Sequence, residues 1–177
     1  MFNWFKQRAL QPEVKLTYNI VVEQARKPTF YTDLKIADTV DGRFDVLGLH
    51  MCILFCRLKN EGSEASKFSQ ALFDLMFKDM DQSLREMGVG DLSVGKRVKE
   101  MGKAILGRLE AYDRAFQSDE MALEMALVKN IYRGDSNLQP QVGRLVDYVN
   151  TARINLAKTP FESIIHGKFS FECQVNG

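Results

Sequence analysis

The chain has 177 residues, of which 45% are hydrophobic and 27% charged, and its formal net charge is +1. This composition is typical of a globular protein of one domain with a substantial core, and it excludes an intrinsically disordered chain. The near-neutral charge argues against general nucleic-acid affinity, so we expect no DNA partner. Three cysteines do not suggest a disulfide framework, and they favour a reducing compartment.

Residues 1–12 form an aromatic and basic extension ahead of the first predicted helix. Phe2, Trp4 and Phe5 stand close to Lys6 and Arg8. Aromatic residues mixed with basic ones favour a membrane–water interface, so the three aromatics are candidate membrane contacts. The alternative is a frayed terminus that docks one aromatic on the core. The extension lacks the apolar core of a secretory signal, and no later run is long enough to span a bilayer.

Helical periodicity dominates the remaining sequence, and strand alternation is almost absent. We predict an all-α fold, a single compact bundle of about six to seven helices over residues 13–167, followed by an extended tail at residues 168–177. Pro28 ends the first helix, and the segment PTFYTDLKIADT after it is predicted to be a long ordered loop. The predicted helices cover residues 13–27, 41–60, 63–87, 93–116, a segment from the Ser118 cap to near Gly134, residues 140–158, and a short helix from residue 159.

Several helix ends and one helix interior carry specific signals. Gly88 follows the third helix in the position where a left-handed residue ends a helix, and TPFE at residues 159–162 has the pattern of a capping box. The fourth helix repeats apolar residues at threes and fours and carries Gly95 and Gly102 one heptad apart. Because each such glycine costs roughly 1 kcal/mol relative to alanine, the pair predicts a close helix crossing.

Two motifs match known sites only in part. GDLSVGKR at residues 90–97 matches the start of a phosphate-binding loop, but Arg97 replaces the hydroxyl residue and a helix precedes the motif where a strand is needed. His50 lies near Cys52 and Cys56 in an apolar run, but no second cluster of His or Cys completes a metal site. We therefore expect no nucleotide hydrolysis, no metal and no cofactor, with His50 buried and hydrogen-bonded.

Charges of opposite sign alternate along the third predicted helix. The main row, at spacings of four, three and four, is Asp74, Lys78, Asp81 and Arg85. Asp79 and Glu86 belong to a neighbouring row. Such alternation is typical of a solvated helix face. The alternative is a small metal- or anion-dependent enzyme in which Asp74, Asp79 and Asp81 supply paired carboxylates.

Two further sets of residues point to binding surfaces. Lys96, Lys99 and Lys103 form a basic stripe on the fourth helix, which either solubilises the helix or docks on ribosomal RNA or anionic lipid. Methionines cluster on the third to fifth helices, beginning with Met76 and Met80. Flexible thioethers either fill a core or line a groove that accepts varied apolar helices.

Four blocks of the chain resemble the ubiquinol–cytochrome c chaperone family, which covers about residues 18–165. They are YNIVVEQARKPTFY, ADTVDGRFDVLGLH, LFDLMFKDMDQSLREMGVGDLSVGKRVKEM and GRLEAYDRAF. The resemblance implies an all-helical, non-enzymatic chaperone without a cofactor, which holds newly made cytochrome b. In mitochondria the family acts with a small partner subunit at the ribosome exit. Here the similarity begins within the first twenty residues, with no long presequence, so we expect a bacterial, cytoplasmic member, peripheral at the inner face of the inner membrane.

The first hypothesis is therefore an assembly chaperone for cytochrome b of the bc1 complex, with no catalytic residues. A peripheral membrane adaptor that uses Phe2, Trp4 and Phe5 is an alternative, as is the acid-cluster enzyme. The candidate surface for client or partner consists of Met76, Met80, Asp74, Asp81, Arg85, Glu86, Lys96, Lys99 and Lys103.

Overall fold

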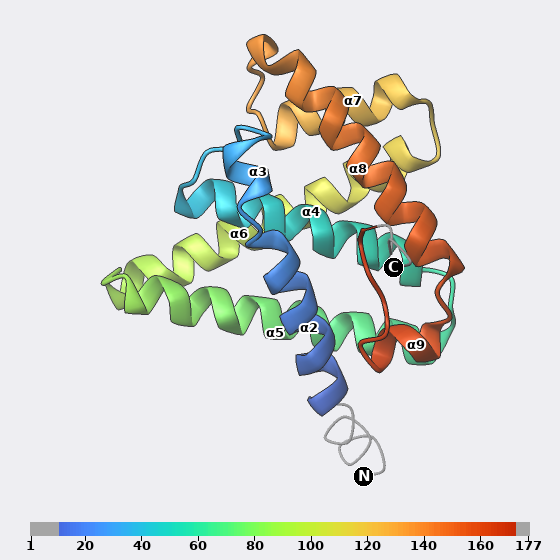
Figure 1. Cartoon of the computed structure of the whole chain (residues 1–177). Helices are drawn as coiled ribbons and strands as arrows, with labels where there is room; N and C mark the ends of the chain where they lie inside the picture. Colours follow the sequence, from blue (N-terminus) through green and yellow to red (C-terminus); the bar gives the residue numbers. More distant parts are fainter. Residues whose placement is uncertain (1–10, 173–177) are drawn as a thin grey trace.

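The computed structural model describes residues 11–172, and every regular element in that range is helical (Figure 1). The seven predicted helices are all present, and the prediction of an all-α bundle is confirmed. In chain order the elements are α2 (Gln11–Ala25), α3 (Thr29–Thr32), α4 (Val40–Leu58), α5 (Ser63–Glu86), α6 (Asp91–Phe116), α7 (Glu120–Asn130), the 3₁₀-helix η1 (Ser136–Leu138), α8 (Gln139–Lys158) and α9 (Phe161–Ile165).

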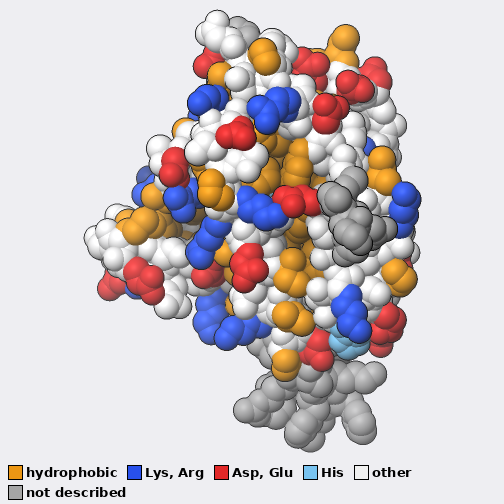
Figure 2. Space-filling model, viewed as in Figure 1, with side chains coloured by type: hydrophobic (Ala, Val, Ile, Leu, Met, Phe, Trp, Pro, Cys, Tyr) orange, Lys and Arg blue, Asp and Glu red, His pale blue; other side chains and the backbone are white. Residues whose placement is uncertain are grey.

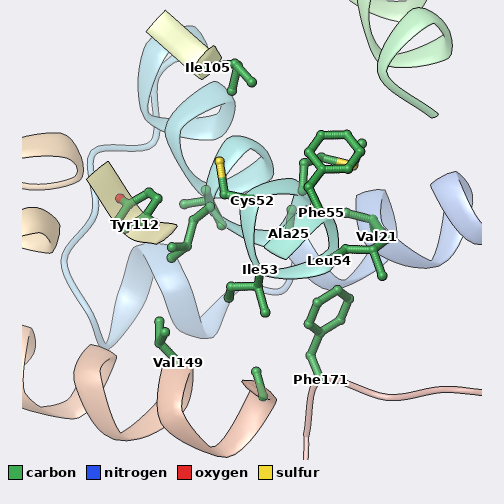
Figure 3. Packing of buried hydrophobic residues seen from close by; sticks show 14 of the residues in the cluster. Val21, Ala25, Cys52, Ile53, Leu54, Phe55, Ile105, Tyr112, Val149 and Phe171 are labelled. Carbon is green, nitrogen blue, oxygen red and sulfur yellow. The ribbon is translucent and has the colours of Figure 1, made fainter. Parts of the chain in front are cut away.

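Helix α4 lies at the centre of the bundle because its sequence is apolar on nearly all sides. It contacts α2, α5, α6 and α8 (Figure 1). Figure 3 shows side chains of α4 pointing toward several neighbours, among them Val21 of α2, Tyr112 of α6 and Val149 of α8. Within residues 11–172, no helix combines the length and the apolar character that crossing a bilayer requires.

The connection from α2 to α4 is ordered, as predicted, but it contains the single-turn helix α3, which the sequence did not predict. One turn is too short to show an apolar period. At the start of α4, the side-chain oxygen of Thr39 accepts a hydrogen bond from the Gly42 amide at 3.1 Å. Gly42 is buried, and a β-carbon there would lie 3.0 Å from the carbonyl carbon of Ala37 and closer still to its oxygen. Helix α4 can therefore begin this close to the preceding segment only with glycine at residue 42.

Helices α5 and α6 form an antiparallel hairpin. Gly88 has a φ of 81° and follows the end of α5, as predicted, because glycine adopts this left-handed conformation without a steric penalty. The predicted close crossing is present at Gly102, where a β-carbon would lie 2.9 Å from the Phe77 ring. It is wrong at Gly95, which is exposed and where a β-carbon would meet no neighbouring atom within 4 Å.

Two predicted caps differ in the structure. Asp119 rather than Ser118 caps α7, and its carboxylate accepts from the Ala122 amide at 2.9 Å. The Thr159 hydroxyl donates to the Asn155 carbonyl at 2.8 Å, so it completes the end of α8 and does not cap α9. A threonine just beyond a helix can satisfy one of the free terminal carbonyls, which here competes with the capping box.

The predicted extended tail lies over the bundle from residue 168 to residue 172. Gly167 turns the chain back with a φ of 67°, and a β-carbon there would lie 2.9 Å from Leu16 and Ile20 of α2. Phe171 is buried against the core (Figure 3). The rest of the predicted tail, residues 173–177, and the N-terminal aromatics lie outside the described residues.

Candidate client-binding groove

A groove of about 350 Å³ lies between α2, the start of α4, the end of α5 and α6, and we call it the methionine groove. Most of its lining is apolar: Val22, Ala25, Tyr31, Val40, Phe44, Leu47, Met80, Leu84, Met87 and Met101. Its remaining lining residues are Arg26, Arg43, Asp79 and Ser83. The volume is within the range of pockets that bind small ligands or a few side chains of a protein partner.

The three methionines of the groove come from predictable positions on two helices. Met80 is on the core-facing side of α5, and Met87 follows the last residue of that helix with half of its surface exposed. Met101 belongs to the apolar seam of α6. Because unbranched thioethers change rotamer easily, this wall can adapt to apolar side chains of different shapes.

Two of the four polar side chains at the edge of the groove are held by partners. The Arg43 guanidinium donates to Asp38 at 2.6 Å and lies 5.5 Å from the centre of the Tyr31 ring. The Tyr18 hydroxyl donates to Asp79 at 2.9 Å, and burial raises the pKa of Tyr18. Arg43 and Asp79 are therefore held in place on two sides of the groove, while most of the lining between them is apolar.

A buried ion pair supports α4 beside the groove. The Asp45 side chain is only 2% exposed and accepts from Arg108 of α6 at 2.6 Å and from Arg133, beyond α7, at 3.2 Å. Burial raises the pKa of Asp45, and the two guanidiniums oppose that shift. The Arg108 guanidinium also lies 5.2 Å from the centre of the Phe44 ring, which lines the groove.

The residues predicted for the client surface are not gathered in one place. Met80 lines the groove, whereas Met76 is fully buried in the core and presents no surface. Lys96, Lys99 and Lys103 are exposed on α6 and are not part of the groove lining.

The predicted acidic and basic residues of α5 also lie outside the groove. Asp81 pairs with Arg85 at 2.6 Å, and Arg85 pairs in addition with Asp91 at the start of α6. The hydrogen bond from Arg85 lowers the pKa of Asp81. Glu86 accepts from Gln82 at 2.8 Å. These contacts are those of a solvated helix face.

The carboxylates of the enzyme alternative each have a separate partner. Asp74 accepts from Gln70 at 2.8 Å, Asp79 from Tyr18, and Asp81 from Arg85. Across residues 11–172, no group of three His, Cys, Asp or Glu side chains is arranged to hold a metal ion. The segment GDLSVGKR follows helix α5 and is helical from Asp91 onward. A helix therefore precedes this motif, as predicted, where a phosphate-binding loop would need a strand.

Periodicity and spacing gave no signal for Val22, Tyr31, Phe44 and Leu47, all of which line the groove. The family resemblance did imply that the Phe30–Tyr31 corner and residues 38–50 and 74–96 shape the fold and the client surface. Phe44 and Leu47 belong to the apolar run of α4, in which exposed and buried positions look alike. Within the residue pattern itself, the methionine cluster was the one available signal, because Met80, Met87 and Met101 all reach this surface.

His50 is buried and hydrogen-bonded, as predicted. Its Nδ1 lies 2.8 Å from the Val46 carbonyl and its Nε2 lies 2.6 Å from the Tyr148 hydroxyl. Gln24 donates to the Tyr148 hydroxyl at 3.0 Å and to Glu172 at 2.9 Å. This network joins α2, α4 and α8 to the C-terminal tail, so His50 has a structural role in holding the tail.

We expect stability to fall on acidification through His50. Burial lowers its pKa from 6.5 to about 4. Below pH 6.5 the native state therefore binds fewer protons than the unfolded state. The free energy of unfolding falls as a result, by about 3 kcal/mol near pH 4. Urea unfolding of wild type and His50→Gln across this range measures the loss. The variant should show a flatter dependence on pH, and identical slopes would contradict the assignment.

The sequence is similar to known proteins over most of its length. The sequence model of the family described as "Ubiquinol-cytochrome C chaperone" matches residues 32–171. Ubiquinol-cytochrome c reductase complex assembly factor 1 of Drosophila melanogaster is 25% identical over 155 residues, covering 85% of this chain and 60% of that protein. The mitochondrial protein CBP3 of Saccharomyces cerevisiae is 28% identical over 146 residues, covering 80% of this chain and 44% of that protein.

A solved structure agrees with the sequence comparisons. The crystal structure of the Cbp3 homolog from Brucella abortus has a TM-score of 0.81 and 35% identity, covering 93% of this chain and 91% of that chain. The chain thus spans about half the length of the two curated relatives above and nearly all of the bacterial homolog. With the family model matching most of its length, the chain belongs to the ubiquinol–cytochrome c chaperone family.

Proposed function

We propose that this chain is an assembly chaperone for the ubiquinol–cytochrome c reductase complex, and that its client is newly made cytochrome b. Its relatives are named as assembly factors for that complex, which supports the assembly role. The methionine groove carries the proposal of a client, because it offers an adaptable apolar wall between the fixed side chains of Arg43 and Asp79. One face of an apolar client helix would place side chains in the groove at helical spacing.

The chaperone would work at the cytoplasmic face of the inner membrane of a bacterium and hold the client before haem is inserted. A small partner subunit and a ribosome are further candidate partners. The adaptor alternative through Phe2, Trp4 and Phe5 stays a prediction. Loss of liposome flotation on deletion of the first eleven residues would support it.

Deletion of the gene in its host tests the assembly role directly. Reduced-minus-oxidised spectra of the membranes should lose the cytochrome b signal of the bc1 complex selectively, and the wild-type gene should restore it. An unchanged spectrum with normal quinol oxidation would rule out cytochrome b as the client in that host.

A carboxylate at the open edge of the groove should weaken client binding. Met87 is half exposed, so Met87→Asp should leave the fold intact. A bound client would have to bury the new charge, which should reduce its capture at least about tenfold. Met121→Asp is the matched control, because Met121 is exposed on α7 and does not line the groove.

Co-purification of cytochrome b with a tagged chaperone, together with rescue of the deletion strain, measures the effect. Thermal unfolding of each purified variant checks that the fold is retained. If Met87→Asp and wild type capture equal amounts of cytochrome b, the client binds at a surface other than the methionine groove.

A further inference from the structure

One face of α6 carries three basic side chains with an apolar side chain at each end, and it points to solvent. Its residues follow one another at four, three, four and three: Leu92, Lys96, Lys99, Lys103 and Leu106. All five are exposed, Leu92 at 97% and Leu106 at 56%. We call this surface the leucine–lysine face. It runs from the start of α6 at the hairpin turn to the middle of the helix.

The three lysines of this face form no ion pair within the described residues. Within residues 11–172, no carboxylate lies within 4.0 Å of Lys96, Lys99 or Lys103, although most arginines of the same range are in ion pairs. Asp91 pairs with Arg85. Glu100 lines a small pocket with Arg97, Arg108 and Arg133 on the adjoining side of α6. The face is therefore a local cationic strip on a chain that is nearly neutral overall.

The leucines decide between the two kinds of polyanion that a cationic strip can bind. A nucleic acid would use the lysines but would gain nothing from Leu92 and Leu106, and the face offers no aromatic side chain for base stacking. At an anionic bilayer, lysines contact phosphates while apolar side chains enter the interface. Figure 2 shows the end of the α5–α6 hairpin projecting from the body, with hydrophobic, basic and acidic side chains at its surface.

We infer that the leucine–lysine face docks the protein on the surface of an anionic lipid bilayer, with α6 along the membrane plane. Lys96, Lys99 and Lys103 contact lipid phosphates, and Leu92 and Leu106 enter the interface. The inference rests on the proposed function for its biological meaning, because a client that is inserted into the membrane would be met there. Unlike the aromatic side chains at residues 2–5, this face lies within the described residues.

Vesicle co-sedimentation of the full chain tests the inference, using phosphatidylcholine alone or mixed with phosphatidylglycerol. Wild type should bind the anionic vesicles only. Changing Lys96, Lys99 and Lys103 together to glutamate should reduce binding at least about a hundredfold. Changing Leu92 and Leu106 together to serine should reduce it about tenfold. The matched control changes Lys67, Lys129 and Lys158 to glutamate, three exposed lysines on other helices with the same change in charge, and should bind nearly as wild type.

Several results would overturn the inference. They are failure of wild type to bind anionic vesicles, equal loss in the control, or undiminished binding after the leucine changes. Loss of vesicle binding only when the first eleven residues are deleted would assign the membrane contact to the extension. Lysine-dependent binding of polyuridine in fluorescence anisotropy, without vesicle binding, would assign the face to RNA. Because the assay contains no cytochrome b, its failure is separate from failure of the spectral test.

Discussion

Replacing Asp45 with alanine should lower the free energy of unfolding by about 3–5 kcal/mol. The Asp45 carboxylate is buried between Arg108 and Arg133, and the substitution leaves the Arg108 guanidinium buried without its counterion. One nitrogen of that guanidinium is already buried without a hydrogen-bond partner. Urea unfolding at neutral pH measures the change.

Two control variants show whether the instability of Asp45→Ala comes from the arginine left without a counterion or from the absence of the ion pair itself. Arg133→Ala should cost less than about 1 kcal/mol, because the Arg133 side chain is mostly exposed. Burial already raises the pKa of Asp45, so the intact pair gains little over apolar packing. Replacing Asp45 and Arg108 together with leucine should therefore recover much of the stability that Asp45→Ala loses. A cost below about 1 kcal/mol for Asp45→Ala would contradict the ion-pair argument.

Gly42→Ala should destabilise the protein by about 3 kcal/mol. The new methyl group would overlap the carbonyl of Ala37, which is backbone and cannot move aside as a flexible side chain could. Relief requires a shift of the segment that enters α4, and α4 contacts α2, α5, α6 and α8. Thermal and urea unfolding of the purified variant measure the effect.

Gly95→Ala is the matched control for Gly42→Ala. Gly95 lies inside α6, is exposed, and has open space where the methyl group would go. Alanine is the better helix former, so this variant should be more stable than wild type by about 0.5–1 kcal/mol. The same substitution should therefore have opposite signs at the two glycines. Equal effects would show that the Ala37 contact does not constrain α4.

Sequence reasoning located the helices because their signals are local. The apolar seam of α6 recurs at threes and fours over the whole helix, and Gly88 ends α5 through its own backbone conformation. Gly95 and Gly102 could not be told apart in this way. Their difference depends on Phe77 of α5, which lies beside Gly102 and has no counterpart near Gly95.

The groove and the buried ion pair depend on contacts between distant parts of the chain. Val22, Phe44, Met87 and Met101 meet only after α2, α4, α5 and α6 have packed. The methionine content indicated which helices line the groove but not which side of each helix does so, and Met76 is buried in the core. Asp45 alone in an apolar run could equally have been a helix-start acid, since its arginine partners follow 63 and 88 residues later.

The hydrogen bonds around His50 also bear on how this chain is synthesised. Gln24, His50, Tyr148 and Glu172 come from both ends of the sequence, and Phe171 covers the His50 ring at a centroid distance of 4.9 Å. Until Phe171 and Glu172 have been synthesised, the imidazole lacks one of the three aromatic rings that pack against it, and Gln24 lacks its Glu172 partner. The central helix therefore reaches its final environment only after residues 171 and 172 have left the ribosome, so the His50 network is the last part of the described fold to form during synthesis.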